Sequence, residues 1–362
     1  MPCYIVSTSS FLPGPPVENA EIEKYLGSLE GEAEVRKSVL SMNGIVRRHY
    51  AQDEYQQATH DVYELATLAV ESCYNRSEQP TPVSLLSAGT TFAPLSGPGI
   101  ASILHHQLQQ RGLMNHPVEI SSHSGVCTSA AAAMVAAIRA VAAGEHSAAL
   151  CVGAEHSSDV LKASAIQPID DRANHADIRQ SQWFMSVFLR FMLSDGAGAF
   201  LLRDCPNAAG VSLKIDWTHS MSFAHETPLC MKLENRTARL TQDVAILSRH
   251  LLPSARKFLA SAMQTHHECL DSYRFVLPHI SSYFFRRRFE QVLKNHSKDS
   301  KNPVPYWTNL ATAGNTGAAS IYVMLDQFLR ENTVSDGDRF LLFIPESGQF
   351  NFVMVSVTAV VQ

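Results

Sequence analysis

The sequence predicts an α/β protein made of a duplicated unit with mixed sheets. Apolar, strand-like segments alternate with segments of helical periodicity along the whole chain. The pattern restarts near Cys205-Pro206, and in each half a strand, a loop of small residues and a helix follow one another once. We therefore expect two halves, residues 1–205 and 206–362, fused into one body, because no linker or low-complexity segment separates them.

The expected elements of the first half begin with the strand CYIVSTSSFLP and a short helix that ends near Gly27. The apolar spacing from Val62 to Cys73 indicates a longer helix. The remaining elements are a buried strand at PVSLLSAGTTF, a helix at GPGIASILHHQLQQRG, a strand at PVEISSHS, an alanine-rich helix, a strand at HSAALCVGAEH, an apolar segment at DIRQSQWFMSVFLRFML and a turn into a strand at SDGAGAFLLRD.

The second half repeats this alternation. It opens with the strand GVSLKIDWTHS, and the helical stretch that follows contains Pro253, where we expect a bend. The strand in SYRFVLPHISS leads into a loop and then into a helix at YFFRRRFEQVLKN. Residues 304–332 are typical of a strand, a loop and a helix, and residues 338–361 predict two closing strands.

Composition excludes several classes of protein. The formal net charge is -5, whereas a protein that binds nucleic acid without sequence preference would be basic. No apolar run reaches about 18 residues and no basic region precedes the apolar N-terminal stretch, so we expect neither a membrane span nor a signal peptide, and a cytoplasmic location. The seven cysteines contain no CxxC pair, which supports neither a metal site nor a disulfide framework.

Cys127 is the first candidate for chemistry, because it stands between a Ser/Gly loop and a run of alanines in SHSGVCTSAAAAMVAA. A cysteine at a helix N-terminus feels the positive end of the helix dipole and unpaired backbone N–H groups, which lower its pKa. The alanines allow the helix to pack closely against a similar one. A buried core cysteine remains the alternative, because position alone does not make a nucleophile.

A thiolate that transfers acyl groups needs hydrogen-bond donors for the developing oxyanion and a group that moves protons. His279 follows an apolar strand in VLPHISS, and Asn315 lies in a Gly-flanked loop before a helix in TAGNTGAAS. Each alone is more typical of a core histidine or a turn asparagine. Together with Cys127 they form a credible Cys-His-Asn constellation.

Three segments, GVCTSAAAAMVAA, LSDGAGAFLL and GNTGAAS, resemble signature segments of β-ketoacyl-ACP synthase III enzymes, and NGIVRRHYA and GTTFAP resemble that family in the right order. The resemblance covers almost the whole chain. It implies the thiolase fold, with a duplicated five-layered α-β-α-β-α core and mixed sheets, and a homodimer. It also implies that Cys127 is the nucleophile, that His279 and Asn315 complete the triad, and that the backbone N–H groups of Cys127 and Gly348 form the oxyanion hole.

The departures from that family point to one branch of it. The chain has HISS where the ordinary synthases have His-Gln-Ala-Asn, PESGQF where their final loop is Gly-rich, and GNTGAAS in place of GNTSAAS. These variants resemble the dialkylresorcinol-forming ketosynthase/cyclase branch. The resemblance implies that a β-ketoacyl thioester and an α,β-unsaturated acyl thioester, carried by acyl carrier protein or coenzyme A, are joined by Claisen condensation and Michael addition. The product is a 2,5-disubstituted 1,3-cyclohexanedione, a separate aromatase acts downstream, and no cofactor is implied.

A β-ketoacyl donor activated by deprotonation calls for a base, and our candidate is Glu155 in CVGAEHSS; a charged strand-end residue is the alternative. The remaining candidates have equally plain alternatives. Arg286 and Arg287 would either dock an acidic acyl carrier protein or form a solvated helix face. Trp183, Phe184 and Phe188 would either line an acyl tunnel or belong to the core.

Three other functions compete with the cyclising ketosynthase. An ordinary β-ketoacyl-ACP synthase III would make a linear β-ketoacyl-ACP from malonyl-ACP. The segments HISS and PESGQF favour the cyclising ketosynthase over this function. A thiol hydrolase with a Cys-His-Asn triad would need a sequence like C-G-[SA]-C-[WY] around its cysteine, which is absent. A non-catalytic ketosynthase partner would be expected to lose the nucleophile, whereas Cys127 is present.

Overall fold

The structure is a computed structural model that describes residues 1–77, 82–165, 174, 176–234 and 239–362. Within these residues nine strands form one sheet in the order β11-β12-β13-β8-β1-β7-β6-β4-β5. Its strands are β1 (Tyr4–Phe11), β4 (Leu85–Thr90), β5 (Glu119–Ser124), β6 (Ala148–Glu155), β7 (Gly196–Arg203), β8 (Val211–Ser222), β11 (Phe275–Pro278), β12 (Arg339–Pro345) and β13 (Asn351–Val361).

The strand order repeats in the two halves of the chain. The run β1-β7-β6-β4-β5 of the first half matches β8-β13-β12-β11 of the second, and a bridge from Val276 to Tyr306 extends the second run where β5 extends the first. Matching helices follow matching strands. They are α3 (Val62–Asn75) and α8 (Val244–Thr265), α4 (Ile100–Gln110) and α9 (Arg286–His296), and α5 (Ser129–Ala143) and α11 (Ser320–Glu331). The predicted duplicated α/β fold is confirmed.

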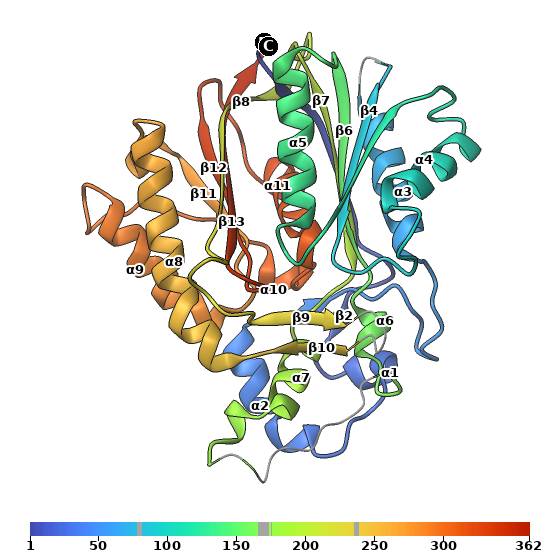
Figure 1. The fold of residues 1–362 in the computed structure, drawn as a ribbon, viewed down its shortest axis with the longest axis vertical. Helices are drawn as coiled ribbons and strands as arrows, with labels where there is room; N and C mark the ends of the chain where they lie inside the picture. Colours follow the sequence, from blue (N-terminus) through green and yellow to red (C-terminus); the bar gives the residue numbers. More distant parts are fainter. Residues whose placement is uncertain (78–81, 166–173, 175, 235–238) are drawn as a thin grey trace.

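The repeat produces five layers (Figure 1). Helices α5 and α11 lie between the strands of the two halves, α3 and α4 cover the outer face of the first half, and α8 and α9 cover that of the second. Small residues let the central layer pack closely: a Cβ at Gly153 would lie 2.7 Å from the Cβ of Ala130. The Tyr322 hydroxyl donates to the Ala130 carbonyl at 2.8 Å and so joins α11 to α5. The alanine run therefore serves the close approach expected of it.

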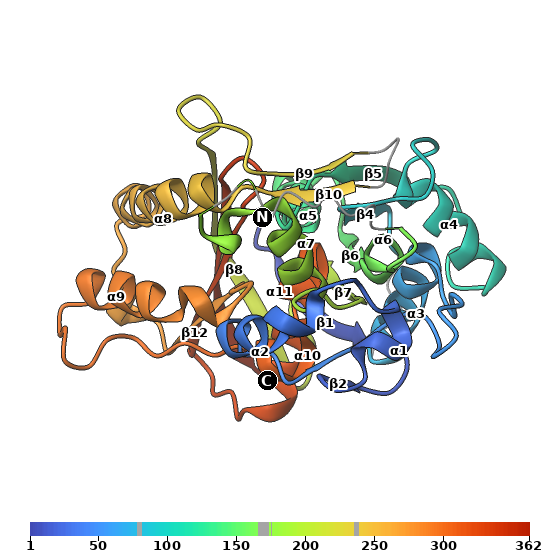
Figure 2. The same cartoon turned by 90° about the horizontal axis from the view of Figure 1, so that it is seen from below.

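A group of smaller elements lies below the layers in Figure 1. Figure 2 shows the molecule from below, with this group toward the viewer. The predicted short helix near Gly27 is present, and α2 and the β9–β10 hairpin were not predicted. These elements are α1 (Ile22–Leu26), α2 (Glu32–Asn43), α6 (Ser158–Leu161), α7 (Gln182–Arg190), α10 (Leu310–Ala313), β2 (Val17–Glu18), β3 (Arg47–Arg48), β9 (Met231–Glu234) and β10 (Arg239–Gln242).

Helix α8 continues through Pro253 from Val244 to Thr265, and the bend expected at that proline stays a prediction. One predicted element differs in detail. The strand expected after residue 304 is reduced to the single bridge at Tyr306. The predicted boundary at Cys205-Pro206 falls in the connection between β7 and β8, and we keep it as a proposal. No helix in the described ranges is long and apolar enough to cross a membrane.

Candidate active site

The candidate site residues follow the carboxyl ends of several strands. Thr91 follows β4, Cys127 comes after β5, Glu155 ends β6, His279 follows β11, and Ser347 comes two residues after β12. Ligands of open α/β sheets bind at these ends, because the loops there converge from different strands. The duplicated topology therefore brings loops from both halves of the chain to one place.

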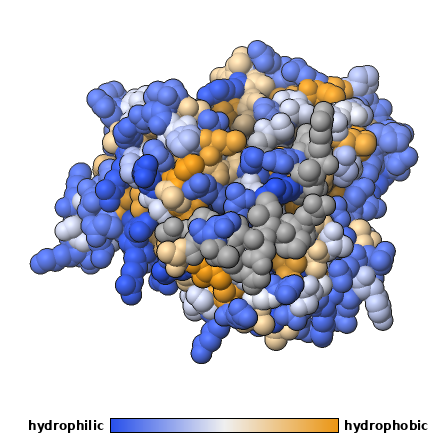
Figure 3. Space-filling view, turned by 60° about the horizontal axis from the view of Figure 1, so that its bottom comes forward, coloured by the Kyte–Doolittle hydropathy of each residue, from blue (hydrophilic) through white to orange (hydrophobic). Residues whose placement is uncertain are grey.

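A mostly apolar cavity opens at this place. Cys127, Glu155 and Asn315 all line it, so the structure brings three of the four predicted catalytic residues together. Ser281 of the HISS loop lines it as well, whereas His279 does not. The face brought forward in Figure 3 carries apolar patches toward its middle, with mainly hydrophilic atoms at its outer margins.

Cys127 lies in the short turn between β5 and α5 and is buried, with 8% of its surface exposed. Burial raises the pKa of its thiol well above the usual range, and the nearby carboxyl groups of Glu346 and Glu155 raise it further. The sequence-based expectation of a pKa lowered by the helix dipole is therefore wrong for this structure. Desolvation and two acidic neighbours outweigh the dipole, so the resting nucleophile is a thiol.

His279 is buried directly after β11, and its backbone N–H donates to the Phe343 carbonyl at 2.8 Å. Its Nε2 has no hydrogen-bond partner among the described residues. Burial lowers the pKa of the imidazole to about 4, so the ring is neutral near pH 7. A neutral ring with a free nitrogen can take up or release one proton.

Asn315 is held rigidly by backbone contacts with the segment after α7. Its N–H donates to the Met192 carbonyl at 3.2 Å, and its carbonyl accepts the Ser194 N–H at 2.9 Å. Its side-chain Oδ1 accepts the Gly317 N–H at 3.0 Å. Gly314, just before it, has φ +73, and a Cβ there would lie 2.8 Å from the Cβ of Ser194. The glycine thus allows the close approach that fixes the asparagine.

Glu155 is a buried carboxyl group whose pKa is raised despite several hydrogen bonds. Its Oε1 accepts hydrogen bonds from the Thr91 N–H at 2.9 Å, from the Thr91 hydroxyl and from the Ala318 N–H at 3.1 Å. Burial nevertheless raises the pKa of the carboxyl from 4.5 to about 7. Gly317 makes room for it, because a Cβ there would lie 2.9 Å from the Glu155 Cγ. A carboxyl group with this pKa can act as a base near neutral pH.

In the loop PESGQF the neighbour of Gly348 lines the cavity, and the role of Gly348 in the oxyanion hole stays a prediction. Ser347 lines the cavity, whereas Gly348 does not, and the Gly348 carbonyl accepts the N–H groups of Cys230 and Met231 at 2.9 and 3.2 Å. Within the described residues, the backbone N–H groups of Cys127 and Ser347 donate to no carbonyl of another residue, and the Cys127 N–H lies against its own thiol. These two donors are therefore available to an oxygen atom in the cavity.

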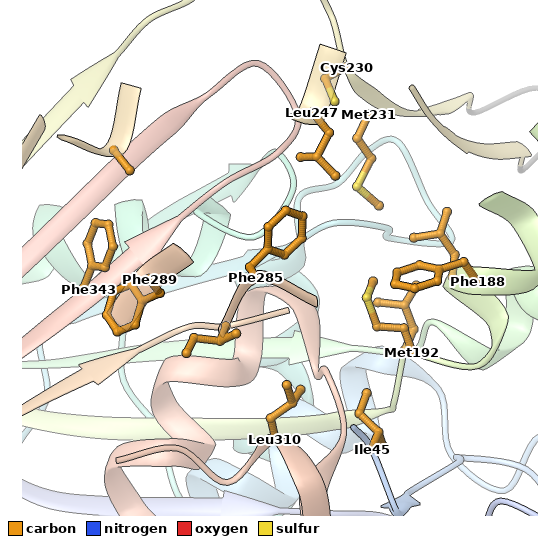
Figure 4. Close-up of a cluster of buried hydrophobic side chains, with 14 of the residues drawn as sticks. Ile45, Phe188, Met192, Cys230, Met231, Leu247, Phe285, Phe289, Leu310 and Phe343 are labelled. Carbon is orange, nitrogen blue, oxygen red and sulfur yellow. The ribbon is translucent and has the colours of Figure 1, made fainter. Parts of the chain in front are cut away.

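Helix α7 and the segment after it form one part of the apolar wall. Phe184 and Phe188 line the cavity as predicted for an acyl tunnel, and Trp183 is buried in the core without lining it. Figure 4 shows Phe188 and Met192 on one side and Phe285 opposite, with further apolar side chains toward the top of the view. The wall suits an acyl chain, because it removes apolar surface from water.

The β9–β10 hairpin was missed in the sequence and forms part of this wall. Met231 and Leu233 of β9 and Leu240 and Gln242 of β10 all line the cavity. The alternating apolar and polar residues of MKLE and the two-residue spacing of Leu240 and Gln242 are the signal that could have indicated these short strands.

The three arginines at the start of α9 are exposed. Arg286 pairs with Glu290 at 3.0 Å, and in the described part of the chain Arg287 forms no ion pair. Arg288 lies over the ring of Phe284, 5.7 Å from its centroid, and Phe284 is both exposed and part of the cavity wall. The positive charge therefore lies beside the cavity.

Over the ranges that the structure describes, no group of three or more His, Cys, Asp or Glu residues could hold a metal ion.

The fold is the thiolase-type fold that the sequence resemblance implied, and the proteins similar to this chain are synthases and condensing enzymes. No family model matches the chain. It is 24% identical over 334 residues to the β-ketoacyl-ACP synthase III of Acholeplasma laidlawii, a match that covers 92% of this chain and 91% of that relative. The chain is thus an enzyme of the β-ketoacyl synthase type, homologous to β-ketoacyl-ACP synthase III.

Solved structures show the same fold. The tetronic acid condensing enzyme AbyA1 superposes with a TM-score of 0.78 at 20% identity, over 98% of this chain and 99% of that one. OleA of Xanthomonas campestris, solved with bound lauric acid and lauroyl-CoA, superposes with a TM-score of 0.78 at 18% identity, over 99% of both chains.

Proposed function

We propose that the enzyme is a cyclising ketosynthase. It condenses a β-ketoacyl thioester with an α,β-unsaturated acyl thioester to a 2,5-disubstituted 1,3-cyclohexanedione, a precursor of dialkylresorcinols or stilbenes. The observation that carries the proposal is Glu155, a carboxyl group with a pKa of about 7 that lines the same cavity as Cys127 and Asn315. A decarboxylating synthase needs no base at the donor carbon, whereas deprotonation of a β-ketoacyl donor does.

The first step loads one acyl chain onto Cys127. Its sulfur forms a bond to the thioester carbon, the bond from that carbon to the carrier sulfur breaks, and the carrier thiol leaves with the proton that His279 transfers from Cys127. The free N–H groups of Cys127 and Ser347 stabilise the oxyanion that develops on the thioester oxygen. Cys127, His279 and Asn315 are thus the proposed triad.

The second step forms the carbon–carbon bonds. Glu155 removes a proton from the carbon between the two carbonyls of the β-ketoacyl thioester, and Asn315 and His279 stabilise the enolate. This carbanion adds to the β-carbon of the enoyl chain held on Cys127, and the enoyl α-carbon takes up a proton. A second carbanion, formed on the other side of the ketone, then attacks the thioester carbonyl; the bond to the Cys127 sulfur breaks, the thiol is regenerated and the six-membered ring closes with its substituents at positions 2 and 5. Hydrolysis of the remaining thioester gives the carboxylate of the dione, and a separate aromatase oxidises the ring.

The extent of the apolar cavity supports the proposal of two acyl substrates. Its wall continues from α7 across to the β9–β10 hairpin and to Phe284 and Phe285. One protein of similar fold is named as a tetronic acid condensing enzyme. Another was solved with bound lauroyl-CoA. The fold is therefore found both in an enzyme named for a cyclic product and in one that binds a long acyl chain. Neither similarity assigns the substrate, which rests on HISS, PESGQF and Glu155.

Two partners belong to the proposal. Acyl carrier protein, which is acidic, would dock on exposed Arg286 and Arg287 beside the cavity. A second copy of the chain would pair along β5, which lies at the end of the sheet and exposes 44% of the apolar Ile120. An edge strand with unpaired backbone groups and an exposed apolar side chain is a surface that another strand can cover.

The second candidate is an ordinary β-ketoacyl-ACP synthase III, because the curated relatives are enzymes of that name. A product assay separates the two. The purified enzyme is mixed with a β-ketoacyl-CoA and a 2-enoyl-CoA without malonyl donor, and products are analysed by mass spectrometry. We expect the mass of the dione or its carboxylate, absent with Cys127→Ala. A linear β-ketoacyl product that forms only with malonyl-ACP would refute the cyclising reaction.

A further inference from the structure

Glu346 is a buried carboxylate beside the nucleophile. It follows β12, exposes 3% of its surface, and does not line the cavity. Its Oε2 accepts the Thr128 N–H at 3.1 Å and also the Thr128 hydroxyl. Its Oε1 accepts the Asn351 side-chain amide at 3.0 Å. One side chain thus joins the residue after Cys127 to a loop 218 positions further along the chain.

This carboxylate links segments that are adjacent in the chain to both proposed N–H donors. Cys127 precedes Thr128, and Ser347 follows Glu346, so each donor is one residue from an end of the contact. The loop is also anchored on its other side, because the Glu346 N–H donates to the Asn351 carbonyl at 2.8 Å. Gly348 fits tightly against this arrangement: a Cβ there would lie 2.8 Å from the Glu346 Oε1 and 3.0 Å from the Val126 Cγ2.

From this geometry we infer that Glu346 is a positioning residue that holds the backbone N–H groups of Cys127 and Ser347 in one oxyanion-binding arrangement. The inference rests on the proposed acyl transfer at Cys127. The two donors come from different halves of the duplicated fold, so their spacing is not fixed by any single element. The carboxylate fixes it through three hydrogen bonds, of which the two to Thr128 are buried.

The same carboxylate places negative charge at the N-terminus of α5. Charged or titratable groups that face the thiol are Glu346 from the loop after β12 and Glu155 from β6, and both disfavour the thiolate. His279, in the loop after β11, is neutral near pH 7. Glu346 therefore has two opposite effects: it positions the donors for acyl transfer, and it suppresses the thiolate.

These effects separate in two assays on the full-length enzyme. Acylation of Cys127 by lauroyl-CoA, followed by free coenzyme A and by intact mass, uses the oxyanion donors. Alkylation by iodoacetamide, followed against pH, depends on the thiolate and does not use them. For Glu346→Ala we expect the maximal acylation rate to fall about 100-fold with little change in the half-saturating lauroyl-CoA concentration. We expect alkylation to accelerate at a given pH.

Glu346→Gln is the matched control, because it keeps the shape and can accept the Thr128 hydrogen bonds without charge. We expect its alkylation profile to shift to lower pH as in Glu346→Ala, and its acylation rate to stay within about tenfold of the parent. Gly348→Ala retains the Glu346 side chain but displaces its Oε1, and should slow acylation. This variant keeps the inference testable if Glu346→Ala does not fold.

Equal acylation rates in Glu346→Ala and the parent enzyme would overturn the inference, and so would an alkylation profile that Glu346→Gln leaves unchanged. The proposed function fails differently. A parent enzyme that acylates on Cys127 but forms no cyclic product refutes the cyclisation and leaves the role of Glu346 standing. A parent enzyme in which lauroyl-CoA acylates no cysteine refutes both.

Discussion

Glu155→Gln should remove a pH dependence from the stability of the enzyme. The carboxyl is buried, and its pKa is raised from 4.5 to about 7 in the folded chain. The folded protein therefore binds this proton more tightly than the unfolded chain does. The stabilising contribution is complete below pH 4.5 and is lost as the pH rises through 7.

The size of the effect follows from the same two values. A difference of about 2.5 in pKa corresponds to about 3 kcal/mol, at 1.36 kcal/mol for each pKa unit. The side-chain amide introduced by Glu155→Gln would be neutral at every pH, and its oxygen can accept the hydrogen bonds of Thr91 and Ala318. The stability of the variant relative to the parent should therefore rise by about 3 kcal/mol between pH 4.5 and about pH 8.

Urea unfolding at a series of pH values measures this difference. Glu34→Gln, on an exposed position of α2, is the control and should follow the parent at every pH. A constant difference between Glu155→Gln and the parent across this pH range would refute the assignment of the raised pKa to Glu155. Other buried acids titrate in both proteins alike, so the difference isolates this carboxyl.

Three further changes test other parts of the structure. Gly317→Ala should cost about 1–2 kcal/mol for its left-handed backbone plus the contact with Glu155, and more in urea unfolding than Gly337→Ala, whose φ is +80 and whose Cβ would touch nothing; equal losses would contradict the contact. Phe188→Ala should shift the preferred acyl-CoA toward longer chains in a competition assay, whereas Trp183→Phe, outside the cavity, should not. Ile120→Asp on the β5 edge should halve the mass measured by light scattering, and an unchanged mass would contradict pairing through β5.

The duplicated fold was predictable because its signals are local. Helical and strand periodicities are strong in both halves, and the small residues around Cys127 and Asn315 mark the loops at corresponding positions. The β9–β10 hairpin and α2 were missed because short, partly polar elements leave weak patterns. Residues 304–307 look strand-like, yet only Tyr306 forms a bridge, since pairing depends on a neighbouring strand that sequence does not show.

The site was predictable by residue type and less so by environment. Cys127, Glu155 and Asn315 do line one cavity. The pKa of the cysteine was expected to fall and instead rises, because the thiol is buried and Glu346, distant in sequence, lies close to it in space. The resemblance implied the Gly348 N–H as an oxyanion donor, and its neighbour Ser347 is the residue of this loop that lines the cavity. Contacts between residues distant in sequence decide the pKa values in the site and which loop residue lines the cavity. No local sequence pattern encodes such contacts.

The nucleophile and the imidazole carry no charge at rest, and this determines how acylation must proceed. Burial raises the pKa of the Cys127 thiol, lowers that of His279 to about 4 and raises that of Glu155 to about 7. Near pH 7 Cys127 is therefore a thiol, the His279 imidazole is neutral and Glu155 is partly ionised, and charge on the thioester oxygen appears only as the thioester is attacked. Interactions made only with that charge accelerate the reaction, so the positions of the Cys127 and Ser347 N–H groups should control the rate more than the thiolate fraction does.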